Sequence, residues 1–453
     1  MYVSASSTLA NIQFKPATSA QPTLSASQPA VSPYSSQDTW TPRLVGDNTI
    51  QAQGKNVGLR IIGKTLGLKA DYMEASFHDK TPNTPIDIEE LDFNLHVKAG
   101  VASVSDVDAT LTVERLLNRK TEGSNKKPLV KDLRVTFNPN NEVRVEGKVR
   151  ALGMNLPIDI KGTVSSTPAG EIRYDLGKAK VAGIGLNGLM SVTGMNLDKL
   201  LKLHNPNEGY YSQGNSLFVN LGTTVSNLDD AIGLQANVHG VSTHLGRLQL
   251  VVGDTPEDAA RALREKQQVE PAYVKATAGH AYIDGFFLKE GKLNIYDLTP
   301  STPLGLNVVG PERSIQVKSG FIGITDARFE ELIKDEIGET DDFTDIDTTL
   351  KKDGAHLKGK LFGAVPVSMN LTFGRTHEGQ LMFTPNSPKA IGFIPLPLGL
   401  VREKVQKLVK TGTPYGDGVA IKGMSGIDLG YISQLVHQNG YIVMEATEKP
   451  QQN

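Results

Sequence analysis

Apolar and polar residues alternate along residues 143–161, which indicates β-strands with one buried face. In VRVEGKVR (143–150) the valines share one face and the charged residues share the other. The segment LPIDIK (156–161) repeats the pattern. Successive side chains of a strand point to opposite sides, so the alternation predicts two half-buried strands. Because turn sequences at 138–141 (NPNN) and 168–170 (PAG) separate the strands, the block predicts an antiparallel meander.

Helical periodicity appears beside these strands. Leu197, Leu200 and Leu201 fall on one side of a helix, with Asn196 as its N-cap. A further helix is predicted within 103–119, beginning in the region 108–112. Residues 394–410 carry a broad apolar side opposite Arg402, Glu403, Lys404 and Lys407, which predicts another helix. The acidic segment 335–347 is interpreted as a solvated loop.

The same blocks recur later in the chain. Residues 355–376 follow the pattern of 143–164, and the segment 320–333 (GFIGITDARFEELI) echoes 102–117. Downstream, 394–410 takes the place of 188–203. Blocks that recur in the same order at nearly constant offset indicate a duplicated domain.

The duplication predicts the following organisation. Residues 1–45 are rich in Ser, Thr, Ala, Pro and Gln and are expected to be disordered. Copy one then spans 46–253 and copy two spans 272–446. The charged segment 254–271 is expected to form a linker helix, and residues 447–453 a loose tail.

Composition narrows the class of protein. The 453 residues carry a net charge of −2, which favours no nucleic-acid partner. The chain has no cysteine, so disulfides, thiolate zinc sites and a cysteine nucleophile are excluded. We find neither a run of about 18 apolar residues nor the pattern of a secretory signal. The compartment and the oligomeric state are therefore left unassigned.

Two short motifs resemble nucleotide-binding loops. Gly58–Thr65 matches G-x-x-x-x-G-K-[ST], but the preceding residues 50–57 are polar and the motif itself is typical of a strand. Gly183–Gly188 matches G-x-G-x-x-G, yet the corresponding IGFIPLPLG (391–399) of copy two contains prolines, which lack the N–H groups that bind a pyrophosphate. Packing and turn roles are favoured for both. With no metal-spaced cluster or catalytic constellation, we expect neither an enzyme, nor a cofactor, nor a metal site.

Residues 100–250 resemble the LmeA-type phospholipid-binding proteins of bacteria. The matching features are the segments 102–111 (ASVSDVDATL), 130–137 (VKDLRVTF), the hairpin 147–162, and the segments 170–175 (GEIRYD), 180–183 (KVAG) and 195–201 (MNLDKLL). That family is similar to tubular lipid-binding (TULIP) domains, in which a long curved antiparallel sheet wraps around helices and holds acyl chains. The resemblance therefore implies a β-rich α+β fold with two tandem TULIP-like domains, similar to the bactericidal/permeability-increasing protein architecture, and a role at the cell envelope.

Together these observations predict a non-enzymatic protein that binds, and carries or transfers, lipid or phospholipid, with transient membrane contact. The alternatives are a structural or adhesion β-scaffold with filled cores and, on the Gly58–Thr65 motif, a nucleotide hydrolase. The apolar side of each strand and helix is expected to line the pockets. The predicted lining residues are Leu116, Leu117, Val145, Val149, Leu156, Ile158, Leu197, Leu200 and Leu201 in copy one, and Leu332, Ile333, Leu361, Val367, Met369, Leu371, Leu398, Val401, Val405 and Leu408 in copy two.

Overall fold

The fold is taken from a computed structural model. It describes residues 48–61, 66–81, 84–87, 93–118, 128–151, 154–185, 204–228, 232–267, 273–283, 286–297, 304–305, 313–337, 343–361, 363–399, 401, 403, 405, 412–424, 427–438 and 440–449. The segment 1–45, for which we predicted disorder, and the predicted helix that contains Leu197, Leu200 and Leu201 lie outside these residues.

The part of copy one that is described, together with the linker segment 254–271, contains strands and three α-helices. Its strands are β1 (Thr49–Ile61), β2 (Leu66–Asp79), β3 (Ile86–Asp87), β4 (Phe93–Ser105), β5 (Val130–Asn138), β6 (Glu142–Ala151), β7 (Met154–Ser166), β8 (Ile172–Val181), β9 (Ile184–Gly185), β10 (His204–Asn205), β11 (Tyr210–Gln213), β12 (Ser216–Val219), β13 (Ile232–Gln235), β14 (Val238–His244) and β15 (Arg247–Gly253). The helices are α1 (Asp106–Asn118), α4 (Leu221–Leu228) and α5 (Pro256–Lys266), with a short 3₁₀ turn at Pro206–Glu208.

Copy two contributes α6 (Asp326–Ile337) and a second set of strands. These are β16 (Tyr273–Ile283), β17 (Phe286–Asp297), β18 (Leu304–Gly305), β19 (Arg313–Thr325), β20 (Phe343–Lys351), β21 (Gly354–Leu361), β22 (Val365–Arg375), β23 (Leu381–Ala390), β24 (Ile394–Pro395), β25 (Thr413–Tyr415), β26 (Gly418–Ile421), β27 (Gly423–Met424), β28 (Ile427–Asp428), β29 (Tyr431–Gln438) and β30 (Tyr441–Thr447).

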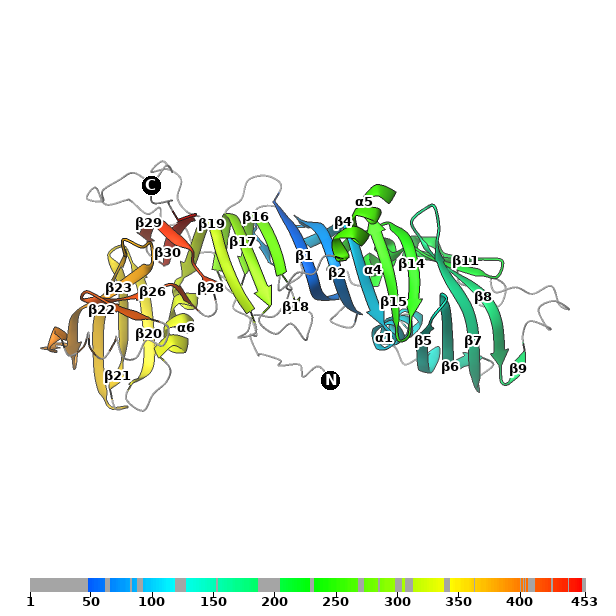
Figure 1. Ribbon diagram of the computed structural model, residues 1–453. Helices are drawn as coiled ribbons and strands as arrows, with labels where there is room; N and C mark the ends of the chain where they lie inside the picture. The colour runs from blue at the N-terminus through cyan, green and yellow to red at the C-terminus, as the bar shows by residue number, and fades with distance from the viewer. Residues whose placement is uncertain are drawn as a thin grey trace.

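The molecule is elongated, with a central sheet flanked by one smaller sheet at each end (Figure 1). The central sheet has 15 strands and runs β14-β15-β4-β2-β1-β16-β17-β19-β28-β27 along its main path. One end sheet, of eight strands, runs β10-β11-β12-β8-β7-β6-β5, and the other, of seven, runs β20-β21-β22-β23-β26-β25. The β-rich α+β class is therefore observed. The single curved sheet expected in each copy is instead divided between an end sheet and the central sheet. The pairing of β1 with β16 joins the central parts of the two copies, so that the molecule has three sheets in all among the described residues.

The strand pairing repeats between the copies. In both, an antiparallel hairpin pairs with a third strand that leads directly into a helix: β1-β2-β4-α1 and β16-β17-β19-α6. The two copies also exchange a short strand, since β3 pairs with β16 and β18 pairs with β1, both in parallel. This reciprocal exchange is what two similar halves related by a two-fold rotation would form.

The centre of the repeat is the pair Ala52–Ala276. These residues oppose each other across β1 and β16. Each also opposes an apolar residue of the strand that follows it, Ala75 for Ala52 and Leu293 for Ala276. Ala276 packs against the buried clusters of both halves. Small residues at this point keep the apolar core continuous across the seam.

In each copy, an aspartate at a helix N-terminus hydrogen-bonds to the strand that follows the helix and to the turn of a later hairpin. Asp106 begins α1, and its Oδ1 accepts a hydrogen bond from the backbone N–H of Phe137 in β5 at 2.8 Å. Its own N–H donates to the carbonyl of Gly246 in the β14–β15 turn at 3.1 Å. Asp326 makes the equivalent contacts with Leu350 and Gly440. The helix begins two residues before the predicted region 108–112, because Ser105 caps it: the Ser105 hydroxyl accepts a hydrogen bond from the Asp108 N–H at 3.1 Å.

Three other element predictions can be compared with the structure. The helix expected at 254–271 is α5, which Thr255 caps and whose Ala262 packs on Tyr72, Ala99 and Val101 of the central sheet. The acidic segment 335–347 was interpreted as a loop, and this is wrong at both of its ends. At the first end α6 continues to Ile337, and at the second β20 begins at Phe343. The helix expected from 394 is preceded by β24, which pairs with β23, and the first helical residue is Leu398.

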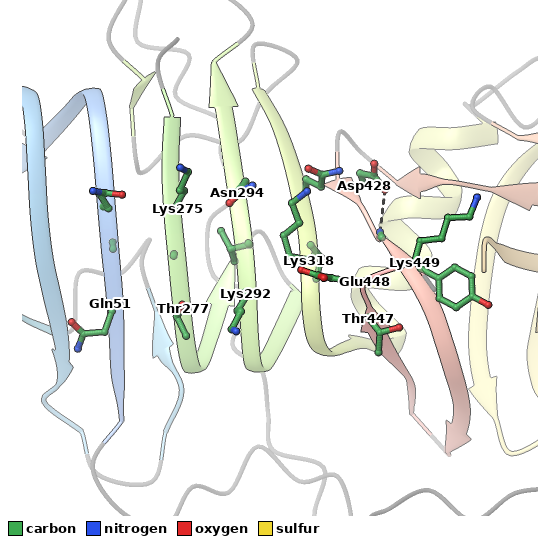
Figure 2. Close-up of a pocket in the computed structure, with 18 of the residues that line it drawn as sticks. Gln51, Lys275, Thr277, Lys292, Asn294, Lys318, Asp428, Thr447, Glu448 and Lys449 are labelled. Carbon is green, nitrogen blue, oxygen red and sulfur yellow. Dashed lines mark hydrogen bonds between the residues drawn. The ribbon is translucent and has the colours of Figure 1, made fainter. Parts of the chain in front are cut away.

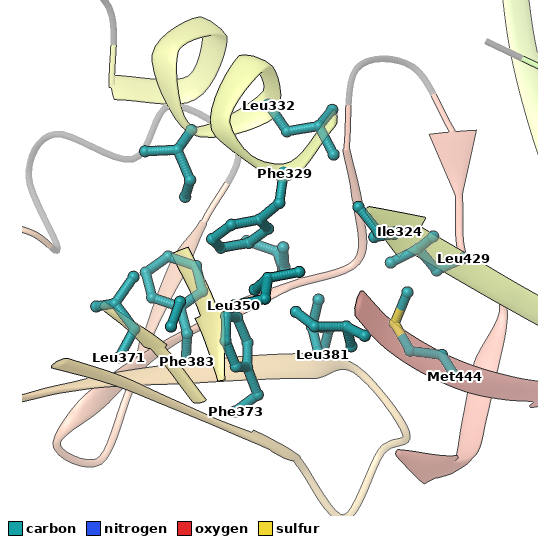
Figure 3. Close-up of a cluster of buried hydrophobic side chains, with 14 of the residues drawn as sticks. Ile324, Phe329, Leu332, Leu350, Leu371, Phe373, Leu381, Phe383, Leu429 and Met444 are labelled. Atoms are coloured by element: carbon teal, nitrogen blue, oxygen red, sulfur yellow. The ribbon is translucent and has the colours of Figure 1, made fainter. Parts of the chain in front are cut away.

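The core lies between the helices and the apolar sides of the sheets. In copy two, Phe329 and Leu332 project from α6 toward Leu350, Phe373 and Phe383 (Figure 3). The rings of Phe329 and Phe373 meet edge to face, with centroids 5.3 Å apart. No helix in the described part of the chain has the length and hydropathy needed to cross a membrane.

Candidate functional site

Each end sheet has a charged outer face and an apolar inner face. On the outer face of copy one, Arg144 contacts Asp159 at 2.8 Å, and the Arg144 guanidinium lowers the pKa of the Asp159 carboxyl. On the inner face Val145 opposes Ile160, and Val149 opposes Leu156. The faces are therefore those that the alternation predicted, because directly opposed residues of an antiparallel pair share one side of the sheet.

Along β6 and β7, burial of this inner face decreases toward the tip of the first end sheet, whereas Val130 of β5, which opposes Val149, is 3% exposed. Val143 and Val164, near the central sheet, are 5% and 7% exposed. Val149 and Leu156, further along β6 and β7, are only half-buried. Met154, at the turn between them, is 57% exposed. The apolar face thus continues beyond the point at which the described residues cover it.

The second end sheet has the same gradient. Leu371 and Phe373 of β22 are 3% and 7% exposed, whereas Val365, at the start of this strand, is 37% exposed. Beyond the end of β23, Ile391 and Phe393 are 52% and 73% exposed. Both ends of the molecule therefore present apolar side chains that are not covered by the described residues.

The structure brings part of the predicted copy-one set together. Leu116 of α1 and Val145 of β6 pack against the same buried cluster. Leu117, Val149, Leu156 and Ile158 are half-buried. Leu197, Leu200 and Leu201 lie outside the described residues. Leu116 and Val145 therefore share one apolar region under the first end sheet, and the other described members are partly shielded from solvent.

The predicted copy-two set is more tightly packed. One buried cluster contains six of its members, each between 0% and 8% exposed: Leu332, Ile333, Val367, Leu371, Val401 and Val405. Leu361 and Met369 pack against this cluster, and Leu398 is half-buried. Leu408 lies outside the described residues. Side chains with so little exposure are in contact with other protein atoms on nearly all sides.

A separate open groove of about 970 Å³ lies on one face of the central sheet (Figure 2). None of the predicted lining residues contributes to it. Cross-strand register places Gln53, Glu74, Lys275 and Asn294 in one row of its floor. Lys318 of β19, together with Glu448 and Lys449 beyond β30, lies further along the groove.

Most of the residues that line the groove are polar, and they carry charges of both signs. Its lysines are Lys98, Lys275, Lys292, Lys318, Lys422 and Lys449, and its carboxylates are Glu74, Glu378, Asp428 and Glu448. Lys422 pairs with Asp428 at 3.2 Å, and Arg261 of α5 pairs with Glu74. Sequence reasoning missed this groove, because it combines strands of copy one with strands of copy two. These two groups of strands lie more than 200 residues apart in the chain and meet only where β1 pairs with β16. The one local signal was the alternation of polar residues around Ala276, Leu293 and Val317.

The nucleotide-loop matches are parts of strands and turns where they are described. Gly58 lies inside β1 and pairs with Lys69 and Gly305. Gly183 lies in the tight turn that joins the antiparallel strands β8 and β9. In the described part of the chain, no group of three or more His, Asp or Glu side chains is placed to hold a metal ion.

Comparisons with known proteins give no family assignment. No family model matches the chain, and a search of curated proteins finds no match. Among solved structures, the search returns lipopolysaccharide binding protein at 8% identity and a TM-score of 0.14, with 90% of this chain and 100% of that chain covered. A TM-score this low carries no argument about fold or function.

Proposed function

We propose that the protein binds lipid, with acyl chains lying along the apolar inner face of an end sheet. The observation that carries the proposal is the gradient of burial. The apolar pattern continues through Val149 and Leu156 to the tip, while the described residues cover these two side chains only in part. An acyl chain along this face would remove both itself and these side chains from water, at roughly 0.8 kcal/mol for each methylene buried.

The proposal includes no catalytic step. Uptake and release of a chain need an apolar surface and access from a tip, and both are present at the end sheets. Within the proposal, residues 46–253 and 272–446 act as two tandem tubular lipid-binding domains of the LmeA type. The sequence resemblance and the repeated order of elements support this interpretation. The acyl chains of a phospholipid are the ligand that the resemblance favours.

Copy one is the better candidate for the occupied site. Its strand members Val145, Val149 and Ile158 are half-buried, whereas Val367 and Leu371 of copy two are already covered by other side chains. The packed cluster of copy two supports the second candidate function, a β-scaffold with filled cores. The two functions differ in whether the purified protein carries lipid.

Lipid extraction and native mass spectrometry of the purified protein provide the direct test. We expect bound lipid in the wild type and less of it in Val149→Trp, because the indole would occupy the space of an acyl chain. We also expect Val149→Trp to retain the wild-type melting temperature.

The matched control is Val405→Trp, at a packed position of copy two. Overpacking should destabilise that variant by roughly 1–3 kcal/mol while copy one retains its lipid. A wild type without lipid, together with a strongly destabilised Val149→Trp, would reject lipid binding in favour of the scaffold.

A further inference from the structure

Two turns meet at the tip of the second end sheet and expose a cluster of apolar side chains. One is the turn at 363–364, which leads into Val365 and Pro366 at the start of β22, and the other is the turn at 391–393 between β23 and β24. The Ile391 N–H donates a hydrogen bond to the Pro366 carbonyl at 2.7 Å and holds the turns together. Val365, Ile391, Phe393 and Ile394 are 37%, 52%, 73% and 43% exposed. The tip forms one extreme of the molecule, and β9 marks the other (Figure 1).

The fold does not require these apolar residues. In copy one the equivalent turn is Ala182-Gly183, and the Ala182 N–H donates to the Pro157 carbonyl at 2.8 Å. Ala182 and Ile391 share the same left-handed backbone conformation, with φ of 52° and 53°. A β-branched residue is unfavourable there. Copy two therefore carries a strained and exposed isoleucine at a position where the same turn forms with alanine.

The two segments that form the tip carry little charge. The sequences 363–366 (GAVP) and 388–399 (PKAIGFIPLPLG) contain no Asp or Glu, and Lys389 is their one charged residue. Lys389 is exposed. Beside the tip, Lys360 opposes Pro366 and pairs with Asp345 at 2.6 Å, so that this carboxylate is neutralised by a lysine. Apolar segments with an exposed lysine and no carboxylate of their own are suited to the boundary between lipid headgroups and acyl chains.

We infer that this tip, formed by Val365, Ile391, Phe393 and Ile394, inserts into the surface of a lipid bilayer. The inference extends the proposed lipid binding by naming the surface that would contact the membrane. The tip projects and would need a concave apolar surface on a protein partner. The open groove of a second copy does not provide one, because lysines, carboxylates and amides line most of it. A bilayer accepts a projecting apolar tip without a preformed pocket.

Co-flotation with vesicles of phosphatidylcholine, with and without phosphatidylglycerol, tests the inference on the full chain. We expect the wild type to float with the vesicles. Phe393→Ser should lower partitioning onto the vesicles about tenfold or more. Burial of one aromatic side chain contributes at least the free energy that corresponds to a tenfold change in partitioning. Ile391→Asn should lower it as well and leave the melting temperature unchanged or raised, since Asn tolerates the left-handed conformation.

Leu245→Ser is the matched control, because Leu245 is 78% exposed in the β14–β15 turn, away from the tip. It should float as the wild type does. In a Trp40→Phe background, the emission of Phe393→Trp should shift to the blue on vesicles, whereas that of Leu245→Trp should not.

The inference is overturned if the wild type does not float, or if Phe393→Ser floats equally well. It is also overturned if Phe393→Ser instead dissociates an oligomer seen by sedimentation, since the tip would then bind protein. Lipid extracted from the same samples separates the two proposals: a Phe393→Ser protein that retains extractable lipid but no longer floats supports the tip and leaves the proposed function standing. Floating wild type without extractable lipid would reject the proposed function alone.

Discussion

At the scale of single residues, the seam between the copies contains a histidine held in its neutral form. His280 of β16 lies beside β1, where its backbone N–H donates to Asn48 Oδ1 at 2.9 Å. Its ring stacks on Phe287 with centroids 6.0 Å apart. Burial, with a smaller contribution from Lys289, lowers the pKa of His280 from 6.5 to about 4. The protonated form is therefore disfavoured in the folded chain.

This lowered pKa predicts acid sensitivity of the seam. The His280 side chain binds a proton near pH 6.5 in the unfolded chain and only near pH 4 in the folded chain. The free energy of unfolding is therefore unaffected by this group above pH 6.5 and decreases as the pH falls toward 4. Because the ring is only partly buried and solvent screens its charge, the loss at pH 4 should stay well below the ~3 kcal/mol that the full shift would give. His280→Gln should reduce the fall in unfolding free energy between pH 7 and pH 4, measured by urea denaturation. Parallel stability curves for the two proteins would contradict the prediction.

At the scale of elements, the helix-terminal aspartates hold α1 and α6 on their sheets. Asp326 accepts the Leu350 N–H of β20, and burial raises the pKa of its carboxyl. The carboxylate is thus kept in a site that disfavours its charge. The backbone hydrogen bond offsets part of this cost, because a buried N–H without an acceptor is itself destabilising.

Asp326→Ala should therefore lower the free energy of unfolding by about 1–3 kcal/mol, since the Leu350 N–H loses its acceptor. Asp326→Asn is the matched control and should be much milder, because the amide oxygen still accepts the bond and carries no charge. Asp106→Ala should have the same effect through Phe137. Denaturant melts measure all three variants. An Asn variant as unstable as the Ala variant would show that the charge, and not the hydrogen bond, holds the helix.

At the scale of the whole molecule, the β1–β16 pairing joins the two copies. Without β16, the 13-residue β1 would be an open edge. Unpaired edge strands readily pair with another chain. The Ala52–Ala276 pair lies at the centre of the repeat, so a second β1 can offer the same register to the first.

A fragment of residues 48–267 should accordingly form a dimer through antiparallel β1–β1 pairing centred on Ala52. Light scattering after gel filtration would measure its mass. Gln53→Pro should return the fragment to a monomer, because proline removes a backbone donor from the edge. A stable monomeric wild-type fragment would show that copy one covers β1 in another way.

The sequence by itself determined which side of each strand is apolar and how the blocks repeat. Val145 and Arg144 face opposite sides, and Gly359 matches Gly147, because alternation and repetition are written in neighbouring residues and need no partner to be recognised. The inner faces of the end sheets were predictable for the same reason. Their tips were not, since exposure at Phe393 depends on what the rest of the chain leaves uncovered.

Only the tertiary structure decided how the two copies join and how deeply each predicted residue is buried. Val367 and Val149 both lie on the apolar side of an alternating strand, yet the first is packed into a core and the second is half-buried. The groove joins Lys275 and Lys292 of copy two to Gln53 of copy one. These outcomes depend on pairs such as Ala52 and Ala276, which lie far apart in the chain. Such pairs leave no local pattern, because a strand carries no signal of which distant edge will supply its hydrogen-bond partners.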